Sequence, residues 1–181
     1  EMPVPNVLAQ GSSSLTLMFQ MMSTAYFFGL NGKDSAWNKQ EKVSFICPVP
    51  GYDRHFSVCE LLGINMINVP MTSNGPDMDA VESLIKTDSS IRGLWCVPKY
   101  SNPTGVVYSD ETVNRIAALG NIAHADFRVF WDNAYAIHDL SDTPVKLASI
   151  FSACDKANTQ DSVIQFASTS KVTLAGAGVA F

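Results

Sequence analysis

The sequence predicts an α/β fold in which helices cover both faces of a mostly parallel sheet. Five short runs are almost continuously apolar, without strict polar and apolar alternation, which is typical of strands buried on both faces. Segments with helical spacing of apolar residues alternate with these runs, and this order indicates crossover connections between parallel strands. The 181 residues suffice for one substantial core, or for one large and one very small domain.

The five predicted strands are bounded by turn-forming or helix-capping residues. In chain order they are KVSFIC (42–47), INMINVP (64–70), RGLWCVP (92–98), FRVFWD (127–132) and SVIQFA (162–167). Because each run is apolar along its whole length, we expect a sheet with a hydrophobic layer on either side.

Four helices are predicted before and between these strands. The first, 12–28, opens on serines that can cap a helix and continues with apolar side chains at helical spacing. The second, 52–63, ends on Gly63, a residue suited to the position after a helix C-terminus. The segments 77–86 and 109–119 start on capping residues and carry acids in the first turn, where the helix dipole favours negative charge.

The composition argues against several classes of protein. A net charge of -5 disfavours nucleic-acid binding through phosphate neutralisation. No apolar run approaches the roughly 18 residues of a membrane helix, and we identify no signal peptide. The four cysteines are widely spaced without a CxxC pair, so we expect buried, reduced thiols, no metal site and a cytoplasmic location.

The two ends of the sequence lack the features of a complete domain. The first residues, EMPVPNVLAQ, have no starting methionine, and the last, AGAGVAF, form an apolar glycine-rich stretch without a capping helix. We therefore expect residues 1–181 to be part of a larger protein.

Polar side chains follow several predicted strands, at the edge of the sheet where ligands bind in α/β folds. After 92–98 comes KYSNPTG, in which Pro103 restrains Asn102 and Gly105 can adopt positive φ. This segment is either an ordinary turn or a rigid support from which the Asn102 amide donates to a ligand.

Asp132 ends the very apolar run 127–132, where a carboxylate is costly without a positively charged partner. Tyr135 lies three residues further on, near enough to share a pocket. Asp132 therefore either caps the next segment or pairs with a buried cationic nitrogen of a ligand.

Lys171 follows the last predicted strand within the tetrapeptide STSK. Partial desolvation at a strand end would favour the neutral, nucleophilic form of its amine. The hydroxyls of Ser168, Thr169 and Ser170 could bind an oxyanion or a phosphate. The alternative is a surface lysine in a loop.

Two further candidates lie nearer the N-terminus. Gly11, Ser12 and Ser13 stand at a predicted helix start, where backbone N–H groups and the helix dipole can bind phosphate. A plain N-cap is the alternative there. Tyr52 follows a Pro-Gly turn and would place an aromatic ring at another strand end, unless it packs in the core.

Taken in order along the chain, these motifs resemble the fold-type I pyridoxal-phosphate enzymes, specifically the class I/II aminotransferases. The resemblance covers nearly the whole chain. It rests on three motifs, NPTG, DNAY and STSK, which lie about 30 and then about 40 residues apart. The sequence also resembles one subgroup of this family, the aspartate-type or MocR-like aminotransferases. This resemblance rests on VPKYSNPTG, on WDNAY and on STSK followed by AGAGVAF.

The resemblance implies a three-layer fold in which residues 1–181 form part of the large cofactor-binding domain. An N-terminal arm and a C-terminal small domain would lie outside this sequence. By the same resemblance, Lys171 forms a Schiff base with pyridoxal 5′-phosphate and then moves the substrate proton. Asp132 pairs with the pyridinium nitrogen, and Asn102 and Tyr135 hydrogen-bond the phenolic oxygen.

The remaining cofactor contacts follow from the resemblance in the same way. Tyr52 stacks on the cofactor ring. The phosphate is held by hydroxyl and backbone groups of Gly11, Ser12, Ser13, Ser168 and Ser170. Many members of the family carry a phosphate-binding arginine about eight residues after the lysine, but this sequence has Val179 at about that place.

The implied activity is transfer of an amino group between an amino acid, with aspartate as the first choice, and a 2-oxo acid. A lyase or decarboxylase on the same scaffold is an alternative, as is the effector-sensing domain of a MocR-type transcription regulator. The family resemblance further implies a homodimer, while the net charge and the lack of a long apolar run argue against nucleic-acid and membrane partners.

Overall fold

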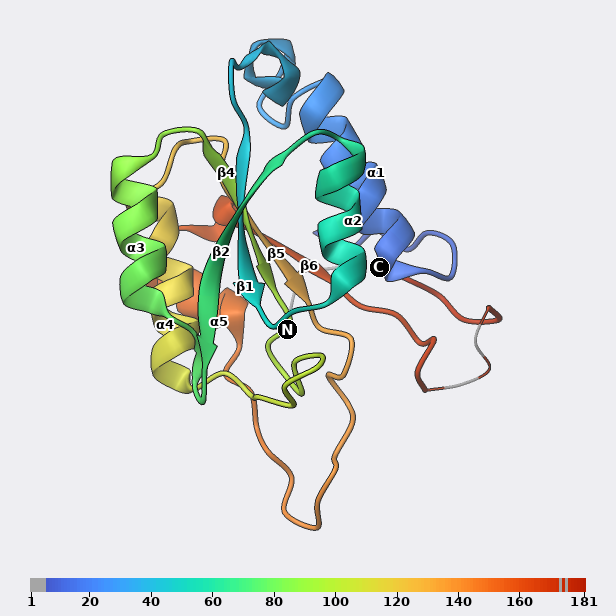
Figure 1. Cartoon of the computed structure of the whole chain (residues 1–181). Coiled ribbons are helices and arrows are strands. Elements are labelled where there is room, and N and C mark those ends of the chain that lie inside the picture. Colours follow the sequence, from blue (N-terminus) through green and yellow to red (C-terminus); the bar gives the residue numbers. More distant parts are fainter. Residues whose placement is uncertain (1–5, 173, 175) are drawn as a thin grey trace.

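The computed structural model describes residues 6–172, 174 and 176–181, and these form a central sheet with helices on both faces (Figure 1). The strand order is β3-β2-β1-β4-β5-β6. Neighbouring strands are parallel except for β2 and β3, which are antiparallel. The strand bounds are β1 (Ser44–Val49), β2 (Asn65–Thr72), β3 (Gly75–Pro76), β4 (Ile91–Cys96), β5 (Arg128–Asp132) and β6 (Val163–Phe166).

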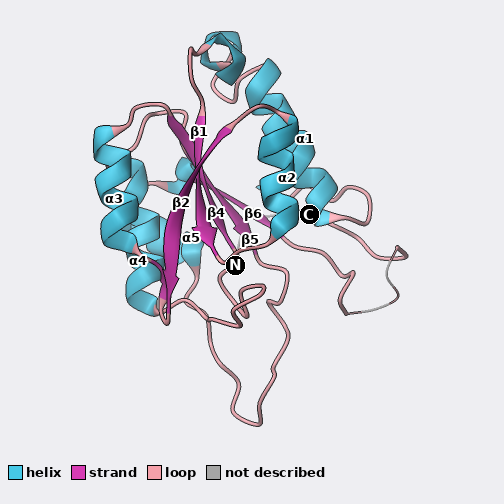
Figure 2. Ribbon diagram, in the orientation of Figure 1, coloured by secondary structure: helices cyan, strands magenta, loops and turns pink. Residues whose placement is uncertain are grey.

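The helices form two outer layers (Figure 2). The helices α1 (Ser14–Phe27) and α2 (Asp53–Leu61) cover one face of the sheet. The other face is covered by α3 (Met78–Thr87), α4 (Asp110–Ala118) and α5 (Ile150–Ala157). Short 3-10 turns lie at Lys33–Ser35, Trp37–Lys39, Leu119–Asn121 and Gln160–Ser162. The prediction of a three-layer α/β fold is confirmed.

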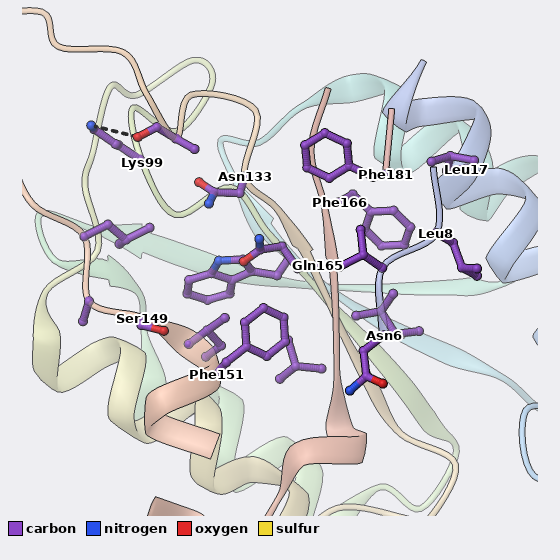
Figure 3. Close-up of a pocket in the computed structure, with 18 of the residues that line it drawn as sticks. Asn6, Leu8, Leu17, Lys99, Asn133, Ser149, Phe151, Gln165, Phe166 and Phe181 are labelled. Carbon is purple, nitrogen blue, oxygen red and sulfur yellow. Dashed lines mark hydrogen bonds between the residues drawn. The ribbon is translucent and has the colours of Figure 1, made fainter. Parts of the chain in front are cut away.

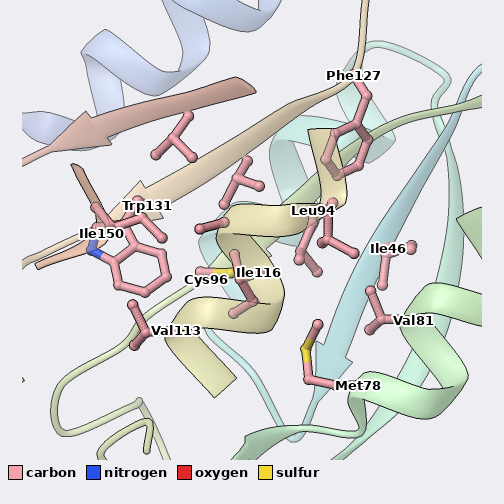
Figure 4. Close-up of a cluster of buried hydrophobic side chains, with 14 of the residues drawn as sticks. Ile46, Met78, Val81, Leu94, Cys96, Val113, Ile116, Phe127, Trp131 and Ile150 are labelled. Atoms are coloured by element: carbon pink, nitrogen blue, oxygen red, sulfur yellow. The ribbon is translucent and has the colours of Figure 1, made fainter. Parts of the chain in front are cut away.

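Each face of the sheet has its own hydrophobic core, because successive side chains of a strand point to opposite faces. In β5, Phe130 packs with Met18 and Met22 of α1. Its neighbour Trp131 packs on the other side with Ile116 of α4, in the cluster shown in Figure 4. Burying such a side chain completely stabilises the fold by about 1.5–3 kcal/mol. The continuous apolar runs of the sequence therefore serve two cores at once.

The predicted strands and the four predicted helices are all present, with bounds displaced by at most two residues. The sequence interpretation missed the two-residue β3 and the helix α5. The signal for α5 is visible in retrospect. Ser149 accepts a hydrogen bond from Ser152 N as the N-cap, and Asn158 ends the helix with a left-handed φ of 55°.

All four cysteines are buried and free, which confirms the expected burial of the thiols. Burial raises the pKa of Cys96 and of Cys154 above the ordinary thiol value, so both remain protonated at neutral pH. No helix in the described part of the chain is long and apolar enough to cross a membrane.

Gly93 in β4 is required by the packing of Phe45. A Cβ atom at position 93 would overlap the Phe45 ring, which lies directly against the glycine backbone. We therefore expect Gly93→Ala to lower the free energy of unfolding by about 1–3 kcal/mol, as overpacked cores do. Urea unfolding measures this change. The double variant with Phe45→Leu should recover part of the loss, whereas a single variant as stable as the wild type would contradict this packing.

Candidate active site

The loops after β4, β5 and β6 begin at the C-terminal edge of the sheet, because these three strands are parallel neighbours. Figure 1 shows the loops after β4 and β5 descending from that edge. Asn133 N, just after β5, donates to Phe166 O at the end of β6, with a distance of 2.8 Å. The candidate residues Asp132, Tyr135 and Lys171 therefore come from adjacent strand ends.

Asp132 is the last residue of β5, and only 5% of its surface is exposed. One carboxylate oxygen, Oδ2, lies 3.1 Å from Nε2 of His55. The other, Oδ1, is buried and has no hydrogen-bond partner among the described residues. A buried carboxylate is stable only when its oxygens are paired, so Oδ1 has an unused capacity to accept a hydrogen bond.

His55 was not identified as a site residue from the sequence. It lies in the first turn of α2, and its ring stacks on Trp95 with a centroid distance of 4.3 Å and an interplanar angle of 11°. Tyr52 contacts the same imidazole edge to face at 5.0 Å. The only sequence signal was an imidazole three residues after Tyr52 at a helix start. Its partner Asp132 is 77 positions away in sequence.

Lys171 lies in a turn beyond the end of β6, and its Nζ is 4.7 Å from the centroid of the Tyr135 ring. Such a contact is a cation–π interaction. The structure therefore brings two of the candidate site residues, Tyr135 and Lys171, into contact. The expectation of a partly desolvated lysine is wrong in this structure, because the residue is exposed in a surface turn five residues after the strand.

The predicted phosphate-binding residues come from two distant parts of the chain that lie side by side. Ser170 Oγ donates to Ser12 O over 2.8 Å, and Ala180 N donates to Gly11 O over 3.1 Å. Ser168 forms an antiparallel bridge with Ala180. The hydroxyl of Ser13 accepts from Thr16 N at 3.3 Å, so Ser13 acts as the N-cap of α1.

Asn102 is exposed in a turn that follows β4. The turn is closed by a hydrogen bond from Gly105 N to Ser101 O of 2.6 Å, and Gly105 has the positive φ of 74° that the sequence suggested. The structure does not bring the Asn102 amide into hydrogen-bond contact with Tyr135 or Asp132. Its side chain is free to reach a ligand.

A large cavity of about 1250 Å³ lies along β6, the edge strand of the sheet, and its lining does not include Asp132 (Figure 3). Its wall includes Gln165 and Phe166 of β6 and Asn6 and Leu8 of the N-terminal segment. Most of the other lining side chains are apolar. The cavity does not include Lys171, so it is distinct from the group of predicted catalytic residues.

Comparison with known proteins gave clear matches over the whole chain. The family model described as aspartate amino-transferase matches residues 1–181. An aspartate aminotransferase from Corynebacterium glutamicum is 49% identical over 179 residues, which cover 99% of this chain and 41% of that protein. The chain thus spans about two fifths of the length of this relative.

Solved structures agree with the sequence matches. The crystal structure of an aspartate transaminase from Corynebacterium glutamicum superposes with a TM-score of 0.92 at 49% identity, covering 99% of this chain and 42% of that one. An α-aminoadipate aminotransferase from Thermus thermophilus, solved with N-(5′-phosphopyridoxyl)-L-leucine, gives a TM-score of 0.72 at 24% identity. The coverage is 96% of this chain and 39% of that chain, and this similarity shows the fold alone.

The contact between His55 and Asp132 is expected to stabilise the fold. His55→Phe keeps an aromatic ring against Trp95 but removes the nitrogen that meets Asp132 Oδ2. We expect the free energy of unfolding to fall by about 1–3 kcal/mol, because a buried acceptor loses its partner. Urea unfolding tests this expectation.

Two further variants serve as controls for that measurement. His124→Phe makes the same change at an exposed histidine, whose Nδ1 accepts from Asp126 N at 3.1 Å, and it should cost less, about 0.5–1 kcal/mol, because water can replace this bond. Adding Asp132→Leu to His55→Phe should reduce the loss, because no unpaired carboxylate then remains buried. Equal stability of His55→Phe and the wild type would show that the contact contributes nothing.

Proposed function

The chain belongs to the aspartate aminotransferase family, and on this premise we propose that it is part of the cofactor-binding domain of a pyridoxal-phosphate-dependent aminotransferase. The single observation that carries this proposal is Oδ1 of Asp132, which is buried without a hydrogen-bond partner among the described residues, at the strand end next to the loop that holds Tyr135 against Lys171.

The residues present fit the cofactor. The protonated nitrogen of a pyridine ring is a cationic N–H donor, and Oδ1 of Asp132 has no donor among the residues that the structure describes. Lys171 offers a primary amine, and no acidic side chain among the described residues forms an ion pair with it. The phosphopyridoxyl group bound by the Thermus protein of the same fold supports the assignment.

When bound, pyridoxal phosphate supplies an aldehyde that condenses with amines and a ring that accepts electrons from the substrate Cα. Asp132 would keep a proton on the ring nitrogen, and His55, 3.1 Å from Oδ2, would orient the carboxylate for this purpose. Lys171 would hold the cofactor through its amine, and the same amine would move the proton at the substrate Cα. These roles are proposed from the positions of the side chains.

The other contacts are proposed in the same way. Tyr52, which contacts His55 edge to face, would stack on the cofactor ring, and Asn102 and Tyr135 would donate to the phenolic oxygen. The phosphate is held by hydroxyl and backbone N–H groups at the start of α1 and in the neighbouring turn, from Gly11, Ser12, Ser13, Ser168 and Ser170. Because Ser13 Oγ caps the helix, its backbone N–H is the group available to phosphate.

The proposed reaction transfers an amino group between an amino acid and a 2-oxo acid. Aspartate is the proposed amino donor because the 49% identical relative from Corynebacterium glutamicum is an aspartate aminotransferase. The groups that select the substrate carboxylates are proposed to lie in a C-terminal small domain of the full-length protein, with an N-terminal arm as a further part. The cavity along the edge of β6 supports the packing of additional chain against this domain.

The full-length protein is proposed to be a homodimer located in the cytoplasm. Large apolar side chains near the candidate site support an interface between two copies, because Ile137 is 70%, Leu140 73% and Leu174 76% exposed. Four buried cysteines without a disulfide support a reducing compartment.

The proposal predicts that pyridoxal phosphate becomes covalently attached to Lys171. Addition of the cofactor to the full-length protein should give a visible absorbance band, and borohydride reduction should then fix the label on the peptide that contains Lys171. Lys171→Ala should abolish both signals. Lys156→Ala, which removes an exposed lysine of α5, should change neither. Labelling confined to other lysines, or equal labelling of Lys171→Ala, would contradict the proposed function.

A further inference from the structure

The loop that follows β5 is held in place by Lys99 and Tyr100, which follow β4. Lys99 is only 5% exposed, and its Nζ donates to Ala136 O at 3.4 Å and to Asp139 Oδ1 at 3.3 Å. The second of these contacts is the dashed line in Figure 3. A buried ammonium is costly unless it is paired, so this lysine is committed to the loop that carries its two partners.

Tyr100 adds a third connection to the same loop. Its hydroxyl accepts a hydrogen bond from Leu140 N at 3.2 Å. Its backbone has a positive φ of 51°, which is uncommon for a bulky residue and persists where the surroundings determine the conformation. With Asn133 N bound to Phe166 O, one end of the segment 133–140 is fixed to β6 and the other to the segment that follows β4.

This fixed loop contacts Lys171 at two places. Nε2 of His138 lies 3.0 Å from Lys171 O, and because a carbonyl only accepts, Nε2 carries the hydrogen and donates it. The Tyr135 ring lies under the Lys171 Nζ and contacts His138 edge to face at 5.6 Å. The main chain and the ammonium group of Lys171 are thus both held by residues of one loop.

We propose that His138 is a positioning residue, which fixes the main chain of Lys171 so that its amine stays at the Tyr135 ring. The inference rests on the proposed function, in which this amine attaches to pyridoxal phosphate. In that attachment the amine nitrogen replaces the aldehyde oxygen, a carbon–nitrogen double bond forms and one water leaves. Holding the lysine near the reacting carbon raises the effective concentration of the amine.

His138→Leu and His138→Gln separate this role from a general effect on the pocket. Leucine removes the donor, whereas the glutamine amide nitrogen can take the place of Nε2. His124→Gln is the matched control, because it makes the same change at an exposed histidine outside the candidate site. All variants are made in the full-length protein.

Two measurements are compared for each variant. The first is the rate at which pyridoxal phosphate is captured at Lys171, followed by absorbance and borohydride trapping. The second is the affinity for pyridoxamine 5′-phosphate, which carries an amine in place of the aldehyde and cannot bond to the lysine. We expect capture by His138→Leu to slow by about two- to tenfold, the effect of one hydrogen bond, with unchanged pyridoxamine phosphate affinity.

Capture by His138→Gln should be near the wild-type rate, and His124→Gln should match the wild type in both measurements. Wild-type capture by His138→Leu would overturn the inference while leaving the proposed function intact. If His138→Leu lowered the rate of capture and the affinity for pyridoxamine phosphate by the same factor, this result would also overturn the inference. His138 would then shape the pocket as a whole. Failure of the wild type to capture the cofactor at Lys171 would overturn the proposed function itself.

Discussion

The carboxylate of Asp132, buried at the end of β5, is the constraint on which the rest of the site depends. An ionised carboxylate out of contact with water costs several kcal/mol unless its oxygens are paired. His55 meets one oxygen at 3.1 Å, and the stacking of His55 on Trp95 holds the imidazole where this contact is possible. The second oxygen is left without a partner among the described residues, and it is the place where a cationic ligand nitrogen would be bound.

The parallel sheet starts the loops that carry the other candidate residues at the edge where this carboxylate lies. Because β4, β5 and β6 are parallel neighbours, the loops that carry Asn102, Tyr135 and Lys171 start at the same edge. The loop after β5 lies between the other two and contacts both, through Lys99 on one side and through His138 on the other. The amine and the carboxylate thus belong to one connected framework rather than to independent loops.

The fold and part of the site could be predicted because their signals are local. Continuous apolar runs identify strands buried on both faces, and Asp132 and Lys171 stand out because each follows such a run. His55 and His138 could not be assigned in this way. Their partners lie 77 and 33 positions away, and only the packing of the sheet shows which groups meet. The exposure of Lys171 also depends on how far its turn extends beyond β6, which no local pattern specifies.

The central claim is that Asp132 accepts a hydrogen bond from a protonated ring nitrogen of pyridoxal phosphate. The most direct test is the ¹⁵N NMR shift of this nitrogen in the full-length protein loaded with ¹⁵N-labelled cofactor. The account predicts the shift of a protonated pyridine in the wild type and a change toward the unprotonated form in Asp132→Asn. An unprotonated ring nitrogen in the wild type, or a shift that Asp132→Asn leaves unaltered, would contradict it.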